Sequence, residues 1–205
     1  RGVTARKTEA SKVVTVTRSD LLGQTISTPA SPDTDFIVRA ITNNPISWRL
    51  TQTAVVGTHL GWYVDLPTPG ERQVTAPLLR EGRIIFTTLV PTSDPCTPGG
   101  TGWLMELNAV NGGQLKDTFD VNEDGAFTVA DRVSGSGVAG IASSDTTKGS
   151  ALSSPIVLAN PSTQRPSSNK ACSETKLAVS TRGNIIRIAE TCTPSDVREG
   201  WRQRK

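Results

Sequence analysis

The residues best suited to chemistry lie in the twelve-residue segment 120–131, which reads DVNEDGAFTVAD. Oxygen donors stand at loop positions 1, 3, 5, 7, 9 and 12, and Gly125 stands at position 6, where a calcium loop turns sharply. Ca²⁺ takes about six to eight hard oxygen ligands, and alternate residues of a tightly wound loop point inward. The spacing therefore predicts a Ca²⁺ site whose ligands are Asp120, Asn122, Asp124, the backbone carbonyl of Ala126, Thr128 and Asp131.

The residues around this segment do not form an ordinary EF-hand, which has a long helix on each side of its loop. Residues 116–119 read as the end of a strand, and residues 129–133 suffice for barely one helical turn. We expect an EF-hand-like loop inserted between strands, with Phe127 anchoring it to the core. The alternative is a simple acidic turn at residues 122–125, but the number of matched ligand positions favours calcium.

Other motifs lack the context that their chemistry needs. Residues 135–140 match G-x-G-x-x-G, but no predicted strand precedes them and no helix follows, so a loop is favoured over a dinucleotide site. The single histidine, His59, has no set of catalytic partners nearby. Trp62, Trp103 and Trp201 are expected to pack, and the basic C-terminal residues to be solvated.

The three cysteines, Cys96, Cys172 and Cys192, are far apart and form no C-x-x-C motif, which excludes a zinc ribbon. A hairpin predicted over residues 176–188 turns between positions 182 and 183, so facing residues have numbers that sum to about 365. The sum for Cys172 and Cys192 is 364, which predicts a disulfide across the hairpin. Cys96 then either pairs outside this chain or stays free.

The elements that must position these groups are short strands. β-Branched runs separated by Gly and Pro predict strands at 12–17, 36–42 and 62–66, with one short helical turn near Ser19. Residues 77–118 predict four antiparallel strands, including a turn at Glu81-Gly82, and residues 154–190 repeat the pattern. Units of about 40 residues favour blades of a β-propeller over a sandwich, and the fold class is all-β.

The composition of the chain excludes several classes of binding partner. With 22 Lys+Arg and 19 Asp+Glu the net charge is only +3, so neither nucleic acid nor an acidic membrane surface is an expected partner. No run approaches the roughly 20 apolar residues of a membrane helix. The chain begins with Arg and carries no signal-peptide pattern, so we expect it to be an excerpt or a mature fragment. The few cysteines without a redox motif and the many Thr, Ser and Gly residues favour an exported protein with one disulfide.

Several strings together resemble the PilY family, the tip adhesins and biogenesis factors of bacterial type IV pili. These strings are 17–22 (TRSDLL), 43–48 (NNPISW), 61–67 (GWYVDLP), 70–72 (GER), 84–88 (IIFTT), 94–96 (DPC), 99–107 (GGTGWLMEL) and 119–125 (FDVNEDG). The run GWYVDLPTPGER followed by DPCTPGGTGWLMEL is more specific than any single short motif. The resemblance extends over nearly the whole chain. It implies the last few blades of a quinoprotein-like β-propeller, because 205 residues are too few for the whole ring.

The resemblance also implies a function. It implies an exported protein at the pilus tip, on the cell surface, in the periplasm or with the outer membrane, which works with minor pilins. The implied roles are pilus biogenesis, control of extension and retraction by Ca²⁺, twitching motility, adhesion and virulence, without enzymatic activity. Contact with a host or abiotic surface would come from an N-terminal region that this chain lacks. The implied calcium ligands are the same six residues as above.

Two alternatives remain at this point. A fragment of a quinoprotein dehydrogenase would share such blades, but this chain has no adjacent cysteine pair and too few residues to enclose a quinone. A dockerin-like scaffold module would use the same type of loop, but it needs two copies, and the sequence contains one.

Overall fold

The protein is built almost entirely of β-strands, as expected. The computed structural model describes residues 3–8, 12–31, 36–49, 57–92, 100–116, 118–143, 151–159, 172–181 and 183–192. Within these ranges the helical elements are two short 3₁₀ turns, Arg18–Asp20 and Val129–Asp131. No helix in the described part of the chain is long and apolar enough to cross a membrane.

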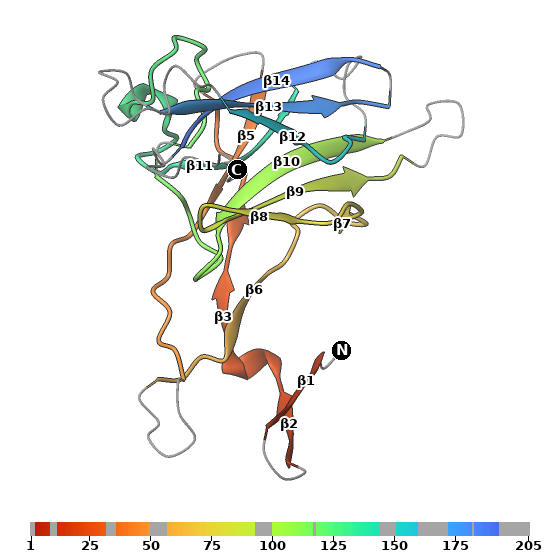
Figure 1. Ribbon diagram of the computed structural model, residues 1–205, viewed down its shortest axis with the longest axis vertical. Coiled ribbons are helices and arrows are strands. Elements are labelled where there is room, and N and C mark those ends of the chain that lie inside the picture. Colours follow the sequence, from red (N-terminus) through yellow and green to blue (C-terminus); the bar gives the residue numbers. More distant parts are fainter. Residues whose placement is uncertain are drawn as a thin grey trace, which may run out of the picture.

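The largest element is a curled seven-stranded sheet (Figure 1). Its hydrogen-bonded order is β4 (Ile26–Ser27), β5 (Phe36–Ile41), β11 (Val138–Ser143), β10 (Thr101–Asn108), β9 (Arg83–Val90) and β7 (Arg72–Gln73), and β8 (Leu78–Arg80) also pairs with β9. All of these pairs are antiparallel. The predicted tight turn joins β8 to β9, with positive φ at both Glu81 and Gly82.

A second, three-stranded sheet lies over this one (Figure 1). Its antiparallel order is β12 (Ile156–Ala159), β13 (Ser173–Val179) and β14 (Ile185–Thr191). Facing residues of β13 and β14 have numbers that sum to 364, one less than the sequence predicted. Cys172 and Cys192 follow that register, and the structure contains the disulfide between them with a Cα–Cα distance of 5.1 Å.

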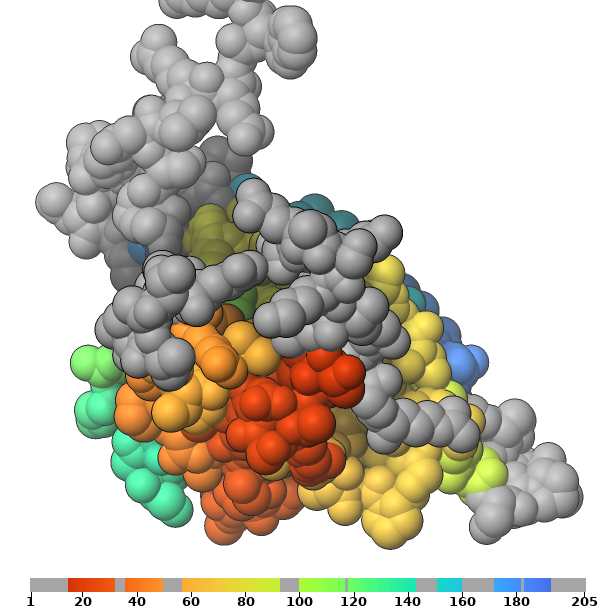
Figure 2. Space-filling view, turned by 90° about the horizontal axis from the view of Figure 1, so that it is seen from below, coloured from red at the N-terminus to blue at the C-terminus, as the bar shows by residue number. Residues whose placement is uncertain are grey.

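Smaller elements complete the chain at the opposite end from β12–β14. β1 (Val3–Thr8) and β2 (Lys12–Val16) form an antiparallel hairpin, and β3 (Leu21–Gln24) pairs in parallel with β6 (Gly61–Val64). Seen from this end, the red and orange segments that precede residue 50 and follow the grey N-terminal residues lie next to one another, with yellow segments beside them (Figure 2).

The main core fills the space between the two large sheets. It contains alternate residues of the central strands, such as Val38, Ile85 and Leu104 from the seven-stranded sheet and Ala178 and Ile188 from the three-stranded one. Alternation arises because successive side chains of a strand point to opposite faces. A second core lies on the other face of the larger sheet, where Phe86, Trp103 and Met105 pack against Trp62 and its neighbours.

One predicted strand is wrong. The fourth strand expected at the end of the unit 77–118 does not form, and Gln114 and Leu115, where it would begin, have no regular structure. The place beside β10 is taken by β11, which follows the loop 120–131. The short Gln114-Leu115 pair offers little apolar alternation, whereas β11 contributes Val138 and Ile141 to the main core.

Candidate functional site

The predicted calcium loop, residues 120–131, lies beside the end of β14. Phe119 bridges to Glu190, the Asp120 amide donates to the Ala189 carbonyl at 3.1 Å, and the Thr191 amide donates to the Thr118 carbonyl at 3.0 Å. The loop thus begins as a short extra strand on the three-stranded sheet, and its first ligand candidate is held by backbone bonds.

Apolar residues anchor both ends of the loop in the main core. Phe119 and Val121 are each 1% exposed, and Val133, just after the loop, is 3% exposed. Phe127, the anchor that the sequence predicted, is only half-buried, and it is not among the residues of the main core. The buried anchors therefore lie at the two ends of the loop, and Phe127 in its middle is not one of them.

Side-chain oxygens of the first half of the loop accept hydrogen bonds from loop amides. The Asp120 carboxylate accepts from the amides of Asp124 at 3.1 Å and Gly125 at 2.9 Å. Asn122 Oδ1 accepts from the Asp124 amide at 3.2 Å, and Asp124 Oδ1 accepts from the Ala126 amide at 2.8 Å. These bonds wind the segment tightly around its carboxylates.

Asp131 closes the loop from the other end. It is 2% exposed, and its Oδ1 accepts from the Val121 amide at 2.8 Å while its Oδ2 accepts from the Thr128 amide at 2.8 Å. Thr128 Oγ1 accepts from the Ala130 amide, which caps the 3₁₀ turn Val129–Asp131. The carboxylates of the first and last predicted ligands, Asp120 and Asp131, thus both accept hydrogen bonds from amides of the loop.

The loop concentrates negative charge. Burial raises the pKa of Asp120 above its ordinary value, and the nearby Asp131 and Asp124 carboxylates raise it further, against the lowering effect of the Gly125 and Asp124 amides. Repulsion among these carboxylates is the condition that a bound cation relieves.

All six predicted positions of the loop carry an oxygen that suits Ca²⁺, but their acidic side chains do not gather around one point. The six predicted positions carry carboxylate, amide, carbonyl and hydroxyl oxygens, which suit a hard cation. Within the described ranges, however, no three side chains among histidine, cysteine, aspartate and glutamate gather as a metal ion requires.

The remaining predicted motifs have structural roles. His59 Nδ1 accepts a hydrogen bond from the Ser47 amide at 3.1 Å. Residues 135–140 form a turn and enter β11 rather than a loop, and a side chain at Gly140 would meet Met105 Sδ at 2.3 Å. Trp103 is buried and Trp62 Nε1 donates to the Ala109 carbonyl at 3.1 Å. Cys96, Trp201 and the basic C-terminal residues lie outside the described residues.

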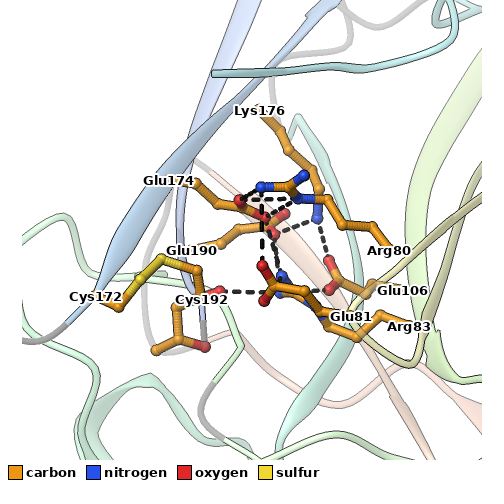
Figure 3. Close-up of polar contacts among 10 residues, drawn as sticks. Arg80, Glu81, Arg83, Glu106, Cys172, Glu174, Lys176, Glu190 and Cys192 are labelled. Carbon is orange, nitrogen blue, oxygen red and sulfur yellow. Dashed lines mark hydrogen bonds and ion pairs between the residues drawn. A yellow bond between two sulfur atoms is a disulfide. The ribbon is translucent and has the colours of Figure 1, made fainter. Parts of the chain in front are cut away.

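Sequence reasoning missed a group of charged side chains that extends from the main core to the partly exposed Arg80. We call it the buried charge cluster: Arg80, Arg83, Glu106, Glu174, Lys176 and Glu190, which come from β8, β9, β10, β13 and β14 (Figure 3). The side chains of Lys176 and the three glutamates are 0% exposed. The available signal was Glu106 within the otherwise apolar run GWLMEL.

Arg83 is the central cation of the cluster. Its guanidinium lies 2.8 Å from Glu106 Oε1, 2.9 Å from Glu174 Oε1 and 3.4 Å from Glu190 Oε2, and it donates to the Thr191 carbonyl at 2.9 Å. Arg80 adds a 2.7 Å bond to Glu174, and Lys176 Nζ donates to both Glu106 and Glu190. Burial and the nearby Glu106 carboxylate hold the pKa of Glu190 well above its usual range.

A separate buried ion pair lies in the second core. Arg39 donates from Nη1 and Nη2 to the two oxygens of Glu71 at 2.7 and 2.8 Å, and its guanidinium stacks 3.8 Å from the centre of the Trp103 ring. Glu71 also accepts from Thr88 Oγ1 at 2.6 Å. This pair fixes the loop before β7 against the sheet.

Comparisons with known proteins point to one family. No protein-family model matches the chain, and no solved structure matches it. A type IV pilus biogenesis factor PilY1 homolog of Xylella fastidiosa is 38% identical over 104 residues, which is 48% of this chain and 6% of that protein. The type IV pilus biogenesis factor PilY1 of Pseudomonas aeruginosa is 28% identical over 139 residues, which is 60% of this chain and 12% of that protein.

A second Xylella fastidiosa homolog is 36% identical over 112 residues, which is 51% of this chain and 8% of that protein. The chain thus spans only a small part of these curated relatives. Over about half of its length, this chain is homologous to type IV pilus biogenesis factors of the PilY1 type.

Proposed function

We propose that this chain is a non-enzymatic, calcium-binding module of an exported type IV pilus biogenesis factor. The observation that carries the proposal is the loop 120–131, whose carboxylates are already ordered by loop amides, in a chain homologous to PilY1 proteins. The disulfide Cys172–Cys192 supports an oxidising compartment outside the cytoplasm.

Calcium would act locally in this proposal. Asp120, Asn122, Asp124, Thr128, Asp131 and the Ala126 carbonyl would hold the ion and remove the repulsion among the carboxylates. The loop begins on the edge of β14, so ordering the loop would also order the end of the three-stranded sheet. Such a change at one edge could alter a surface that contacts minor pilins, and hence pilus extension, retraction, twitching motility and adhesion.

The propeller belongs to the proposal as well. The outer face of the β12–β14 sheet exposes Ile156, Leu158, Val179 and Ile185, at 62%, 48%, 44% and 58%. An apolar sheet face of this kind supports packing of a further sheet of the longer protein, as between neighbouring blades. A structure of the full-length natural protein tests this: a closed ring of small sheets supports it, and an isolated two-sheet unit contradicts it.

Calorimetric titration of the purified chain with CaCl₂ tests the binding. We expect one site with an affinity in the broad micromolar-to-millimolar range of sensor and extracellular loops. Asp120→Ala should abolish binding, whereas Asp65→Ala should leave it unchanged, because Asp65 is exposed and pairs with Arg18 outside the loop. Absence of heat with the wild-type chain would overturn calcium binding.

Pilus number and twitching motility in a strain that carries Asp124→Ala, with expression matched to the wild type, test the regulatory role. We expect fewer surface pili or altered motility. Normal pili and motility with calcium binding lost in the purified variant would remove the regulatory role.

A further inference from the structure

The Lys176 ammonium nitrogen is enclosed by two carboxyl groups deep in the main core. Lys176 Nζ donates to Glu106 Oε2 and to Glu190 Oε2, and all three side chains are 0% exposed (Figure 3). The Phe119 ring centre lies 6.0 Å from Nζ. Lys176 and Glu190 are diagonal neighbours on the inner face of β13 and β14, and Glu106 reaches them from β10 of the opposite sheet.

This arrangement holds an amine and a carboxyl group in contact and away from water, which does not happen when they are free in solution. Free in solution, the two groups are both ionised and are rarely in contact. Here they are fixed in contact in a site that excludes water, and such positioning reaches effective concentrations of about 10⁵–10⁸ M. Water exclusion also favours a condensation, whose product is water.

The Glu190 and Glu106 carboxyl groups have different surroundings. Burial and the neighbouring Glu106 carboxylate raise the pKa of Glu190 well above its usual range, which favours its neutral acid form. Glu106 lies 2.8 Å from the Arg83 guanidinium. Two carboxyl groups in different surroundings can take separate acid and base roles. The Oε1 atom of Glu190 is buried and accepts no hydrogen bond from the described residues.

We propose that the side chains of Lys176 and Glu190 form an intramolecular amide bond, with Glu106 as the proton-transfer group. The bond would be a covalent modification site within the β13–β14 hairpin. It would replace a buried ammonium and a buried acid by one neutral amide, which removes the desolvation cost of burying Lys176.

The step balances without any added reagent. The Glu106 carboxylate takes one proton from the Lys176 ammonium, and the lone pair of the resulting amine forms a bond to Cδ of the neutral Glu190 carboxyl. The carbonyl electron pair moves to oxygen, where Arg83 Nη1, 3.4 Å from Glu190 Oε2, stabilises the negative charge.

The intermediate then collapses. Glu106 returns its proton to the Glu190 hydroxyl, the C–O bond breaks and water leaves. Glu106 takes the second proton from nitrogen. The sum is one ammonium, one acid and one carboxylate giving one amide, one water and one protonated Glu106.

Intact mass spectrometry of the purified 205-residue chain, reduced and denatured, tests the proposal. We expect a mass lower than the sequence mass by one water molecule. Fragmentation of a tryptic digest should show a peptide pair joined through Lys176 and Glu190, with no cleavage after Lys176. Lys176→Arg, which keeps the positive charge but cannot form this bond, should have the full sequence mass.

Three outcomes would overturn parts or all of the proposal. A wild-type chain with the Cys172–Cys192 disulfide formed but with the full sequence mass would exclude the bond. Water loss that maps to Asp124-Gly125, where a cyclic imide can form, or to Glu106, would also exclude the assignment to Glu190. Complete water loss at the Lys176–Glu190 pair in Glu106→Gln, as fast as in the wild type, would remove the role of Glu106.

Discussion

Glu174 and Glu190 lie directly opposite each other on β13 and β14, with both side chains completely buried. Two acidic side chains that face each other across two strands disfavour each other's ionised form. Arg83 contacts both carboxyl groups from the other sheet, and Arg80 contacts Glu174. The β13–β14 hairpin therefore depends on β8 and β9 for charge compensation, and the two sheets are held together by more than apolar contact.

Removing the central cation tests this dependence. Arg83→Met should lower the free energy of unfolding by about 3–5 kcal/mol, because it leaves buried carboxylates without their partner. Arg187→Met, on the exposed outer side of β14, should change it by less than about 0.5 kcal/mol. Urea unfolding monitored by tryptophan fluorescence measures both. Equal effects of the two substitutions would show that the cluster does not hold the sheets together.

The Arg39–Glu71 pair should make the stability of the fold sensitive to acid. Burial tends to raise the pKa of Glu71, but the hydrogen bonds from Arg39 and Thr88 outweigh burial and hold it below its ordinary value of 4.5. The Glu71 carboxyl group therefore stays ionised to lower pH in the folded protein than in the unfolded chain. Its contribution to stability is complete above about pH 4.5 and is lost as pH falls through the lower, folded pKa.

Glu71→Gln should therefore reduce stability near neutral pH and make unfolding less dependent on pH in the acid range. Thermal unfolding at a series of pH values from neutral to about pH 3 measures this. The exposed Asp65→Asn is the control for loss of one carboxyl group. An acid dependence of Glu71→Gln identical to that of the wild type would contradict the assignment.

The disulfide predicts a loss of stability on removal. Cys172 and Cys192 are separated by 20 residues, and closing a loop of this size stabilises by about 3 kcal/mol in the chain-entropy model. The double variant Cys172→Ser/Cys192→Ser should lose about that amount in urea unfolding. Cys96→Ser, which leaves this disulfide in place, is the control. A double variant as stable as the oxidised wild type would show that the link adds nothing.

Alanine substitutions at two glycines with similar φ angles distinguish the cost of backbone strain from the cost of a packing clash. Gly112 (φ +68°) and Gly82 (φ +74°) both have left-handed backbone, but a Cβ at Gly112 would lie 2.2 Å from the Trp62 ring, whereas nothing lies within 4 Å at Gly82. Gly82→Ala should cost roughly 1–2 kcal/mol from backbone strain alone. Gly112→Ala should cost about 1–3 kcal/mol more, because Trp62 must move. Thermal unfolding of both variants checks the difference, and equal losses would contradict it.

Calcium should stabilise the fold if the loop binds it. At about 100 times the dissociation constant, a ligand specific to the folded state adds about 2.7 kcal/mol to the free energy of unfolding. The melting temperature of the wild-type chain should rise with CaCl₂ and not with NaCl of equal ionic strength. Asp120→Ala should remove the shift, and Asp65→Ala should keep it. A shift of the same size in Asp120→Ala would place the ion elsewhere.

Local features of this chain could be predicted from the sequence because they depend on neighbours in sequence. The strands 36–42 and 62–66, the turn at Glu81-Gly82 and the 3₁₀ turns near Ser19 and after Thr128 follow from β-branched runs, turn residues and caps. The near-match of Cys172 to Cys192 in hairpin register is also local, because one short turn sets the pairing. The bonds between loop carboxylates and amides at 120–131 span at most ten residues.

The tertiary structure alone decided which distant strands meet. Glu106 and Lys176 are 70 positions apart, and Arg39 and Glu71 are 32 apart, yet each pair is completely or almost completely buried. The pattern around Glu106 shows an apolar strand with one charge, and it does not show the partner. The choice of β11 rather than residues 114–115 beside β10 is of the same kind. Such choices depend on how the faces of two sheets fill one core and neutralise its charges together. The spacing of residues within one segment does not determine this.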